Sequence, residues 1–235
     1  MSGVVLEGPI RSVGASGRLT PELILRAYAL GIFPMARHRS DPVVHWVAPP
    51  TRGIFPLDHF YVPRRLRRSV RRRLYETRCN AAFESVIDAC ASPAAGRDDT
   101  WINGEIRGSF VALHASGFAH SVECWREGRL VGGLYGVALG GAFFGESMFS
   151  QERDASKIAL VNLVARLRLG HFSLLDIQFV TPHLSQFGAI DIPAAEYLDR
   201  LNDAIQMNAT FHPEESPFVD SAVDALLTQS STQMS

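Results

Sequence analysis

Few cysteines and no long apolar run limit the classes of protein to which this sequence can belong. The chain of 235 residues has three cysteines, Cys79, Cys90 and Cys124, and none of them forms a CxxC pair. An odd and scattered set of this kind indicates reduced thiols rather than a disulfide framework. The longest uncharged stretch, residues 130–145, is broken by six glycines, and it is shorter than the roughly 20 apolar residues that span a membrane. No membrane association is therefore expected.

The sequence also lacks the common cofactor and catalytic motifs. It contains no GxGxxG, GxxxxGK, GxSxG or HExxH, which weakens the dehydrogenase, NTPase and serine-hydrolase interpretations. The eight histidines are scattered, so no metal and no cofactor are expected. Residues 1–18 have no long apolar core, which predicts no signal peptide. Together with the reduced thiols, this predicts a cytoplasmic protein.

Positive charge is concentrated in one segment, although the formal net charge is only −1. Residues 64–78 contain eight arginines and a single acid. Pro63 opens a predicted helix, RRLRRSVRRRLYE, whose apolar residues recur every four positions. Guanidinium groups match phosphate oxygens, and several of them together give salt-sensitive binding of nucleic acid. The alternative is a solvated surface face, the usual fate of charge runs. The arginines on the remaining faces of this helix are Arg64, Arg67, Arg68, Arg71 and Arg72.

The order of local signals divides the chain into a small first unit and a larger second one. Short strand-like runs punctuated by proline and glycine precede residue 60, so residues 1–60 are interpreted as a small α+β domain. Residues 61–208 form the predicted larger domain. Residues 209–235, rich in Ser, Thr, Gln, Pro and acids, are expected to form a flexible tail.

Capping, turn and periodicity signals predict the individual elements. Thr20 as N-cap, Pro21 in the first turn and Gly31 after the last turn favour a helix over 19–31. Further helices are predicted over 81–91, 103–115, 154–170 and 194–206, and strands over 120–128, 129–141, 142–150 and 172–180. This order predicts an α+β fold with an antiparallel sheet flanked by helices.

Two short segments carry polar residues at the ends of predicted strands. Glu146 stands between Gly145 and Ser147, where a carboxylate in a partly apolar site either pairs or has a raised pKa. The alternative is a glutamate in a tight turn. In LLDIQF, Asp176 and Gln178 share one face of a strand. Two polar groups there are costly to bury without partners, so they indicate a site floor, a partnered buried network or an exposed edge strand.

Taken together, these segments resemble the leucyl/phenylalanyl-tRNA–protein transferases of bacteria. The matching runs include AYALGIFPM, HWVAPPTRGIFP, FESVIDACA, TWIN, LVGGLYGVALGGAFFGESMFS, DASKIAL, LLDIQ and FGAIDIP. They span residues 19 to about 201. The long run from LVGGLYG to GESMFS, followed by ASK and DxQ, is the most specific of them.

The resemblance implies an enzyme that moves Leu or Phe, and less often Met, from aminoacyl-tRNA to an N-terminal Arg or Lys of a protein. The product is marked for degradation by the N-degron pathway. The implied partners are Leu-tRNA, Phe-tRNA and Met-tRNA, together with proteins or peptides that begin with Arg or Lys. The larger domain is expected to resemble the acetyltransferase (GNAT) fold, with a mixed sheet and no coenzyme A. The absence of a long exposed apolar stripe predicts a monomer.

The resemblance also implies the site residues. The catalytic residues are expected to be Asp176, Gln178 and Glu146. The pocket for the aminoacyl-adenosine end is expected to include Trp46, Trp101, Phe110, Leu134, Phe143, Gly145, Ser147, Leu163, Leu167 and Ile177. On local sequence alone, Trp46 and Trp101 are more typical of core packing. Phe110 stands where the family pattern has a tyrosine, so any hydrogen bond from that hydroxyl is absent. The arginine helix matches the region expected to meet the tRNA acceptor stem.

Several hypotheses remain at this point. Gln178 is expected to orient the acceptor amine or the ester carbonyl, and Asp176 to polarise Gln178 or relay a proton. Alternatively, the 2′-hydroxyl of the tRNA moves the proton while the protein aligns the reactants. An acyl-coenzyme A N-acetyltransferase is a competing class, but SQERDASK offers no glycines to a pyrophosphate. A non-catalytic RNA-binding protein is another, but it leaves Asp176, Gln178 and Glu146 without a role.

Overall fold

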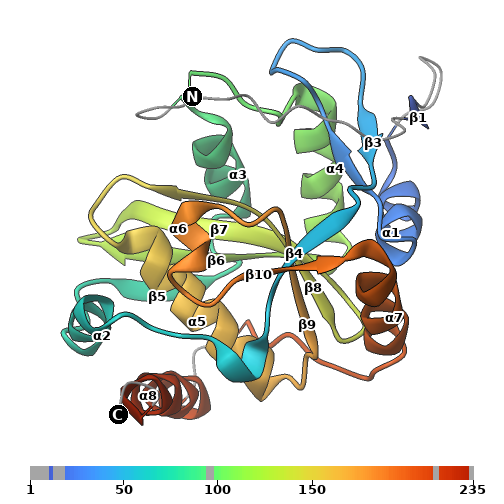
Figure 1. Cartoon of the computed structure of the whole chain (residues 1–235). Coiled ribbons are helices and arrows are strands. Elements are labelled where there is room, and N and C mark those ends of the chain that lie inside the picture. The colour runs from blue at the N-terminus through green and yellow to red at the C-terminus, as the bar shows by residue number, and fades with distance from the viewer. Residues whose placement is uncertain (1–10, 13–18, 94–97, 214–216, 233–235) are drawn as a thin grey trace.

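The computed structural model describes residues 11–12, 19–93, 98–213 and 217–232 (Figure 1). Apart from residues 11–12, the segment for which no signal peptide is predicted lies outside the described residues. None of the helices in the described part of the chain is long and apolar enough to cross a membrane.

Two sheets organise the described residues. A three-stranded antiparallel sheet has the order β1 (Arg11–Ser12), β3 (His45–Val47), β2 (Phe33–Met35). The seven-stranded sheet has the order β10 (Ile190–Pro193), β4 (Thr51–Phe55), β9 (Leu174–Gln178), β8 (Ala142–Ser150), β7 (Arg129–Leu139), β6 (Ala119–Arg126), β5 (Glu76–Cys79). Its neighbours are antiparallel except β8 and β9, which are parallel. The α+β fold with a mixed sheet is therefore confirmed.

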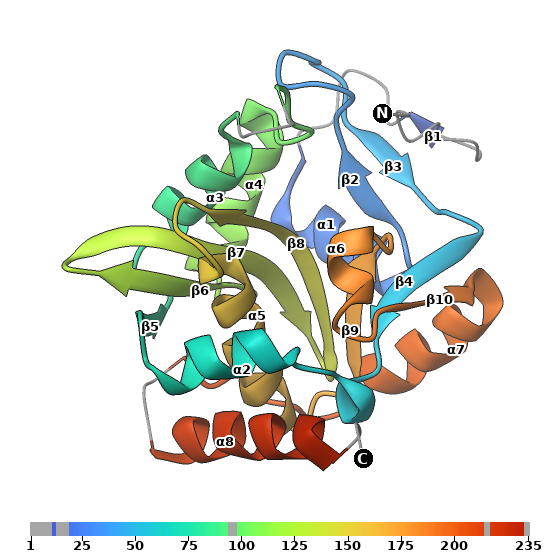
Figure 2. The same cartoon turned by 60° about the vertical axis from the view of Figure 1, so that its left-hand side comes forward.

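Helices cover both faces of the larger sheet (Figures 1 and 2). One face packs against α1 (Pro21–Ala29), α3 (Phe83–Ala91), α4 (Gly104–Ala115) and α7 (Ala194–Ile205). The other packs against α2 (Arg64–Arg71), α5 (Ala155–Leu169) and α8 (Pro217–Thr232). Two short helices complete the set, the 3-10 helix η1 (Leu57–His59) and α6 (Pro182–Ser185). We call the two hydrophobic clusters the α4-side core and the α5-side core.

Side-chain caps begin two of these helices, at the predicted N-cap Thr20 and at Asn103, the predicted first residue of its helix. The Thr20 hydroxyl accepts a hydrogen bond from the Leu23 N–H at 3.3 Å, and the Asn103 side chain accepts one from the Ile106 N–H at 2.8 Å. Each bond satisfies one of the amide groups that a helix leaves unpaired in its first turn. The predicted starts of α1 and α4 are therefore confirmed.

The predicted arginine helix is shorter than its apolar spacing indicated. α2 ends at Arg71, and Arg73 has a φ of 47°, which is outside the right-handed helical region. Leu66 is buried, but Leu74 at the far end of the predicted stripe is exposed. The chain then forms the edge strand β5. Its first residue, Glu76, is the last residue of the predicted helix.

The predicted boundary at residue 60 does not follow the sheets. β4 belongs to the predicted small domain, but it pairs with β9 and β10 in the seven-stranded sheet. The run TRGIF could be read as a strand, but its partners lie far along the chain, so its sheet could not be read from the sequence. The small N-terminal unit is thus built from β1, β2, β3 and α1.

The predicted flexible tail also differs from the structure. Within it, α8 packs along α5, and the side chains of Val219, Leu226 and Leu227 are buried. Burial of these apolar side chains stabilises the helix. The polar composition of the segment as a whole did not indicate this burial.

Candidate active site

The larger sheet opens where β8 and β9 separate. These two strands are in register over Ala142 with Leu174, Phe143 with Leu175, and Phe144 with Asp176. β8 then continues to Ser150, while β9 ends at Gln178 and pairs there with Gly53 of β4. Residues 145–148 of β8 are half-buried beyond the paired part. Figure 2 shows the two strands diverging from their paired ends. Glu146 and Gln178 thus lie just beyond the last paired residues, one on each strand.

A buried ion pair holds the base of this opening. The Asp176 carboxylate is bound by the Arg52 guanidinium, with Nε 2.9 Å from Oδ1 and Nη2 2.7 Å from Oδ2. The Tyr197 hydroxyl donates to Oδ2 at 2.7 Å, and the Gln178 backbone N–H donates to Oδ1 at 2.8 Å. Asp176 has no exposed surface. Its two oxygens are therefore committed to protein donors, which is how a buried charge is made tolerable.

Arg52 is held as firmly as its partner. Its guanidinium lies 4.6 Å from the ring centroids of both Phe33 and Tyr197, and Nη1 donates to the Gly31 carbonyl at 3.1 Å. Burial disfavours the charged guanidinium, but the Asp176 charge and hydrogen bonds outweigh it, so the pKa of Arg52 is raised. This arginine joins β2, β4, β9 and α7 around one charge, and it is 1% exposed.

The backbone turns sharply at Gln178. The Phe179 N–H donates to the Ile177 carbonyl at 2.6 Å, and Gln178 between them has a φ of 57°. A three-residue turn with positive φ at its centre is the rare and strained form of γ-turn. Gly53 makes room for it, because a Cβ at this glycine would lie 2.8 Å from the backbone of Phe179 and Val180. The Asp176 carboxylate holds the N–H of the turn, so Asp176 fixes the position of Gln178 through the main chain.

The Gln178 side chain has an unused donor. The residue is 8% exposed, and its Nε2 is buried with no hydrogen-bond partner among the described residues. An unpaired buried amide costs about 1–3 kcal/mol, and here it coincides with backbone strain. Such a combination is typical of functional positions. The amide can donate to an oxygen that a ligand brings into the opening.

Glu146 lies across the opening and is paired with a tyrosine. The Tyr28 hydroxyl donates to Glu146 Oε1 at 2.6 Å, and the Tyr28 ring packs on Phe144 with centroids 4.5 Å apart. Burial raises the pKa of Glu146 to about 8. The Tyr28 hydrogen bond lowers this pKa, the Asp176 charge raises it further, and the Arg52 charge lowers it. Burial also raises the pKa of Tyr28. Glu146 is therefore a carboxyl group that exchanges its proton near neutral pH.

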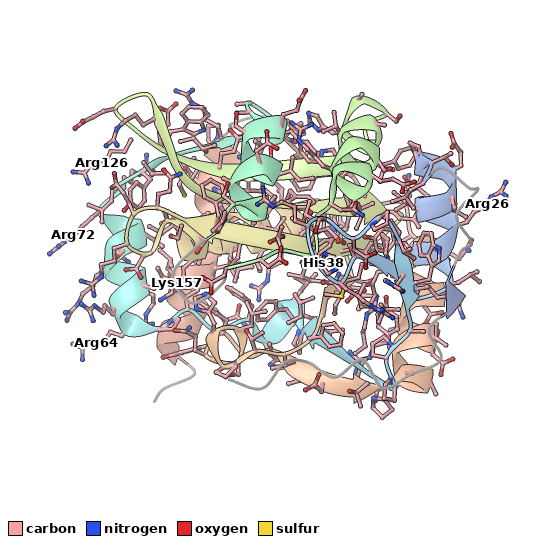
Figure 3. All side chains as sticks on the ribbon, turned by 90° about the horizontal axis from the view of Figure 1, so that it is seen from above. Arg26, His38, Arg64, Arg72, Arg126 and Lys157 are labelled. Carbon is pink, nitrogen blue, oxygen red and sulfur yellow. The ribbon has the colours of Figure 1, made fainter. Side chains whose placement is uncertain are left out.

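The α2 arginines form a separate, exposed surface. Arg64, Arg68, Arg71 and Arg72 are exposed, and Figure 3 shows Arg64, Arg72 and Arg126 at one end of the molecule, opposite Arg26. Arg67 is the exception among the five predicted arginines. It is buried at 8% exposure next to Leu66 on the inner side of α2, so its predicted contact with nucleic acid does not fit the structure. The described residues contain no cluster of three His, Cys, Asp or Glu side chains suited to a metal ion.

Comparison with known proteins gives a consistent result. The sequence model of the leucyl/phenylalanyl-tRNA protein transferase family matches residues 54–202, and that of the family's N-terminal domain matches residues 17–50. The chain belongs to the leucyl/phenylalanyl-tRNA–protein transferase family. The resemblance predicted from the motifs is therefore confirmed.

Individual relatives support the assignment. The leucyl/phenylalanyl-tRNA–protein transferase of Paramagnetospirillum magneticum is 58% identical over 193 residues, which are 82% of this chain and 92% of the relative. Proteins of the same name from Rhodopseudomonas palustris are 56% identical over 84% of this chain and 88% of the relative (strain HaA2), and 51% identical over 93% and 98% (strain TIE-1). The predicted enzyme class, a leucyl/phenylalanyl-tRNA–protein transferase, is confirmed with the family.

The structure divides the predicted pocket residues of this transferase between the two faces of the sheet. Trp46 and Phe110 are buried in the α4-side core, and Trp101 packs against it. The α5-side core contains or contacts Leu134, Phe143, Leu163, Leu167 and Ile177. Gly145 and Ser147 flank Glu146 on the half-buried part of β8.

Three residues that contact the predicted site carboxylates were not singled out from the sequence. Arg52 and Tyr197 bind Asp176, and Tyr28 binds Glu146. Tyr28 and Arg52 lie in runs that carry the family resemblance, AYALGIFPM and HWVAPPTRGIFP. No local signal pairs the three residues with their carboxylates, because the Tyr28 and Arg52 contacts join residues 118 and 124 positions apart, and even the Tyr197 contact spans 21 positions.

Proposed function

We propose that this transferase moves a leucyl or phenylalanyl group, and less often a methionyl group, from aminoacyl-tRNA to the α-amine of a protein or peptide that begins with Arg or Lys. The product enters the N-degron pathway, and the enzyme acts in the cytoplasm as a monomer. The observation that carries the proposal is the unpaired Gln178 amide at the opening between β8 and β9. An amide there suits an ester carbonyl that enters with the tRNA 3′ end.

The reaction needs no external energy, because the ester bond is already activated. The acceptor amine, in its neutral form, attacks the ester carbonyl carbon and forms the new C–N bond. The bond from that carbon to the ribose oxygen breaks, and the proton lost by the amine ends on the ribose hydroxyl. Holding the amine against the carbonyl can supply up to about 7–11 kcal/mol of the barrier.

Gln178 is the catalytic donor in this proposal. Its Nε2 group hydrogen-bonds the carbonyl oxygen, which becomes negative as the amine adds. A fixed donor aimed at developing charge is worth about 2.7–4 kcal/mol in comparable sites. Asp176 is a positioning residue, because it is fully buried and holds the Gln178 N–H and Arg52. Of the two hypotheses about the proton, this arrangement favours transfer through the 2′-hydroxyl of the tRNA, since no free oxygen of Asp176 faces a ligand.

Glu146 serves the basic acceptor. A carboxyl group with a pKa raised to about 8 by burial gains its negative charge when a cation approaches. The positive N-terminal residue of the acceptor supplies such a cation, and the Tyr28 hydroxyl keeps the carboxylate aligned. We expect the pKa of Glu146 to fall when the acceptor binds.

The domain resembles an acetyltransferase (GNAT) fold in having two parallel strands that separate at the site, but its coenzyme A position is altered. The first-turn amides of α5 are already bonded: the Ala155 N–H to the Glu152 carbonyl at 3.3 Å, and the Ser156 N–H to the Ser150 hydroxyl at 3.2 Å. A pyrophosphate would need such amides free. Asp154 also places a negative charge there. These features favour an aminoacyl-tRNA donor over an acyl-coenzyme A donor.

A transfer assay tests this function directly. Labelled Leu-tRNA is mixed with the enzyme and a peptide that begins with Arg, without ATP or coenzyme A. We expect label to appear on the peptide and not on the same peptide with an acetylated N-terminus. Phe-tRNA and Met-tRNA are compared in parallel. Transfer to the acetylated peptide, or a requirement for coenzyme A, would contradict the proposal.

A further inference from the structure

A concave region next to α2 is lined by arginines from three parts of the chain. One wall consists of Arg65, Arg68 and Arg72 of α2 and its C-terminal end. The facing wall carries Arg126, from the end of β6, and Arg153, from the connection between β8 and α5. The space between them has a volume of about 530 Å³. We call this region the arginine notch.

The notch has more positive charge than its own acids neutralise. Its lining contains five arginines and two carboxylates, Glu152 and Asp154. Both carboxylates are already paired with the second wall: Glu152 with Arg126 at 3.0 Å, and Asp154 with Arg153 at 3.8 Å and with Lys157 at 3.4 Å. The second wall is thus close to neutral, and the excess positive charge lies on the α2 wall. Among the described residues, no acid pairs with the three arginines of the α2 wall. An anion entering the notch therefore meets unneutralised guanidinium groups.

Hydrogen bonds fix the separation of the two walls. The buried Tyr75, which follows α2, donates its hydroxyl proton to the Arg153 carbonyl at 2.9 Å. The Ser69 hydroxyl donates to Asp154 Oδ2 at 3.4 Å. These bonds tie α2 to the connection between β8 and α5. The notch is thus a preformed feature with defined width, which reduces the entropy lost when a ligand binds.

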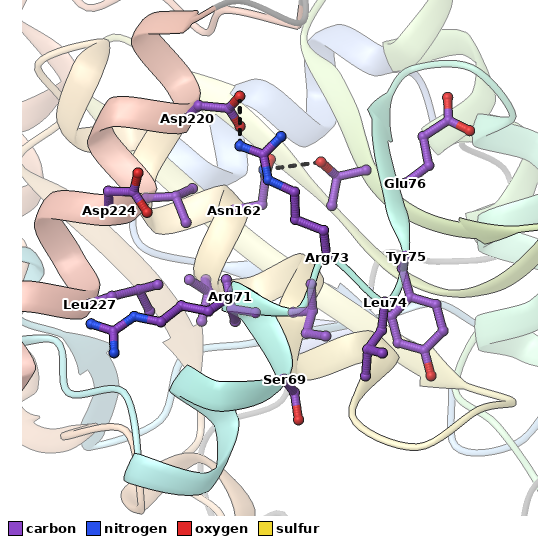
Figure 4. A pocket seen from close by; sticks show the side chains of 15 residues that line it. Ser69, Arg71, Arg73, Leu74, Tyr75, Glu76, Asn162, Asp220, Asp224 and Leu227 are labelled. Carbon is purple, nitrogen blue, oxygen red and sulfur yellow. Dashed lines mark hydrogen bonds and ion pairs between the residues drawn. The ribbon is translucent and has the colours of Figure 1, made fainter.

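A neighbouring cavity beside α2 has a different charge pattern. A second cavity of about 550 Å³ lies between α2, β5, α5 and α8, and Arg71 and Arg73 line it together with acids. Figure 4 shows Asp220 of α8 facing Arg73, at 3.2 Å, with Asp224 beside it. The acids of α8 neutralise this side, so a polyanion gains little there. Of the two neighbouring cavities, the arginine notch is therefore the one that favours a phosphate.

We propose that the arginine notch holds a backbone phosphate of the donor tRNA, with Arg126 and Arg153 as the second wall of a clamp whose first wall is α2. The proposal rests on the proposed function and extends it to two residues outside the arginine helix. Guanidinium groups on facing walls can bind the free oxygens of one phosphodiester from both sides. The RNA then runs from α2 toward the turn between β6 and β7, away from the acids of α8.

Salt dependence of tRNA binding tests the clamp. The affinity of uncharged tRNA is measured by fluorescence anisotropy at several salt concentrations, for the full chain and for the double variant Arg126→Ala/Arg153→Ala. Each lost phosphate contact lowers the slope of log Kd against log salt by roughly one. We expect a slope lower by about one to two and a weaker affinity at low salt. Arg26→Ala, which removes an exposed arginine at the opposite end of the molecule, should change neither.

A variant that is expected to bind tRNA more tightly controls for loss of binding through misfolding. Glu152→Gln removes the carboxylate that pairs with Arg126 and Arg129, at 3.0 and 3.4 Å. Both arginines then become available to phosphate, so tRNA should bind more tightly and with a steeper salt dependence. A misfolded variant would not bind more tightly.

The outcomes separate the clamp from the proposed function. If the double variant keeps the wild-type slope while Arg68→Ala/Arg72→Ala lowers it, the clamp is wrong and the contact through α2 stands. If the double variant raises the KM of the acceptor peptide and leaves tRNA binding unchanged, the notch binds acidic polypeptide and the proposal is overturned. Transfer of leucine in the assay above tests the proposed function independently of either result.

Discussion

Arginine has opposite roles in two regions of this transferase. Arg52 is 1% exposed and gives its donors to Asp176 and Gly31, between two aromatic rings. The arginines along the outer side of α2 are exposed, and the three on the α2 wall of the notch, Arg65, Arg68 and Arg72, pair with no acid of the described residues. The first environment uses the charge to hold strands together, because a buried guanidinium must be neutralised where it lies. The second leaves the charge available to a partner.

The largest effect is expected from breaking the buried pair. Arg52→Gln leaves Asp176 as an uncompensated charge among packed strands. Removing one partner of a buried pair costs about 3–5 kcal/mol, so the unfolding free energy in urea should fall by that amount. Arg52→Lys keeps a charge but not the two-pronged geometry, and should lie between wild type and Arg52→Gln. A loss below about 1 kcal/mol would show that the pair is not a structural centre.

The next effect concerns the catalytic donor. Gln178→Ala removes an amide nitrogen that has no partner among the described residues, so the unfolding free energy should not fall and should rise by up to about 1–3 kcal/mol. The rate of transfer at saturating tRNA should fall about 10²- to 10³-fold, as when one donor to a developing oxyanion is deleted. Gln186→Ala, at an exposed glutamine after α6, is the matched control and should keep wild-type rate. A normal rate in Gln178→Ala would remove its catalytic role.

A pH-dependent effect is expected at Glu146. Burial raises its pKa in the folded protein to about 8, from an ordinary value of 4.5. Between these pH values the unfolded chain releases its proton first, so stability is lost as pH rises, by up to about 1.4 kcal/mol per pH unit. Glu146→Gln has no such proton. The unfolding free energy of wild type relative to Glu146→Gln should therefore decline from pH 5 to pH 8, and parallel curves would contradict the shift.

The smallest effect is expected at the exposed pair beside α8. The side chains of Arg73 and Asp220 keep 75% and 61% of their surface exposed. Exposed pairs contribute about 0–1 kcal/mol, so Arg73→Ala should move the unfolding free energy by no more than that. Thermal unfolding at low and high salt measures the difference. If Arg73→Ala lowered the unfolding free energy as much as Arg52→Gln, the exposed and the buried arginine would contribute equally to stability, and the comparison would be wrong.

The sequence predicted the local features of this fold better than the distant ones. The helix starts at Thr20 and Asn103, and the consecutive strands β6, β7 and β8, follow from caps, turns and alternation near each residue. The partner of Asp176 did not, because Arg52 lies 124 positions away and nothing in TRGIF indicates which carboxylate it meets. The polar pair of Asp176 and Gln178 was found because polar and apolar residues alternate along the strand. The backbone turn at Gln178 was not predicted.

Two predictions, those for the tail and for Arg67, were wrong because they gave more weight to composition than to the spacing of residues along a helix. The tail was judged by its polar residues, yet Val219, Val223, Leu226 and Leu227 follow the spacing of one helical face, and three of them are buried in α8. Arg67 was expected to contact nucleic acid because it belongs to a charge run, although it lies beside Leu66 on the buried side of α2. In both cases the neighbours that decide burial come from another part of the chain.

The turn at Gln178 sets protein stability against activity. A φ of 57° is a conformation that glycine adopts freely and that costs other residues about 1–2 kcal/mol. Gln178→Gly would relieve that strain and remove a buried amide nitrogen that has no partner in the described part of the chain, while deleting the group proposed to bind the ester. Selection for a more robust fold alone would thus remove glutamine from this position. Its presence records a compromise in which the protein gives up part of its stability to keep an amide ready for the incoming aminoacyl group.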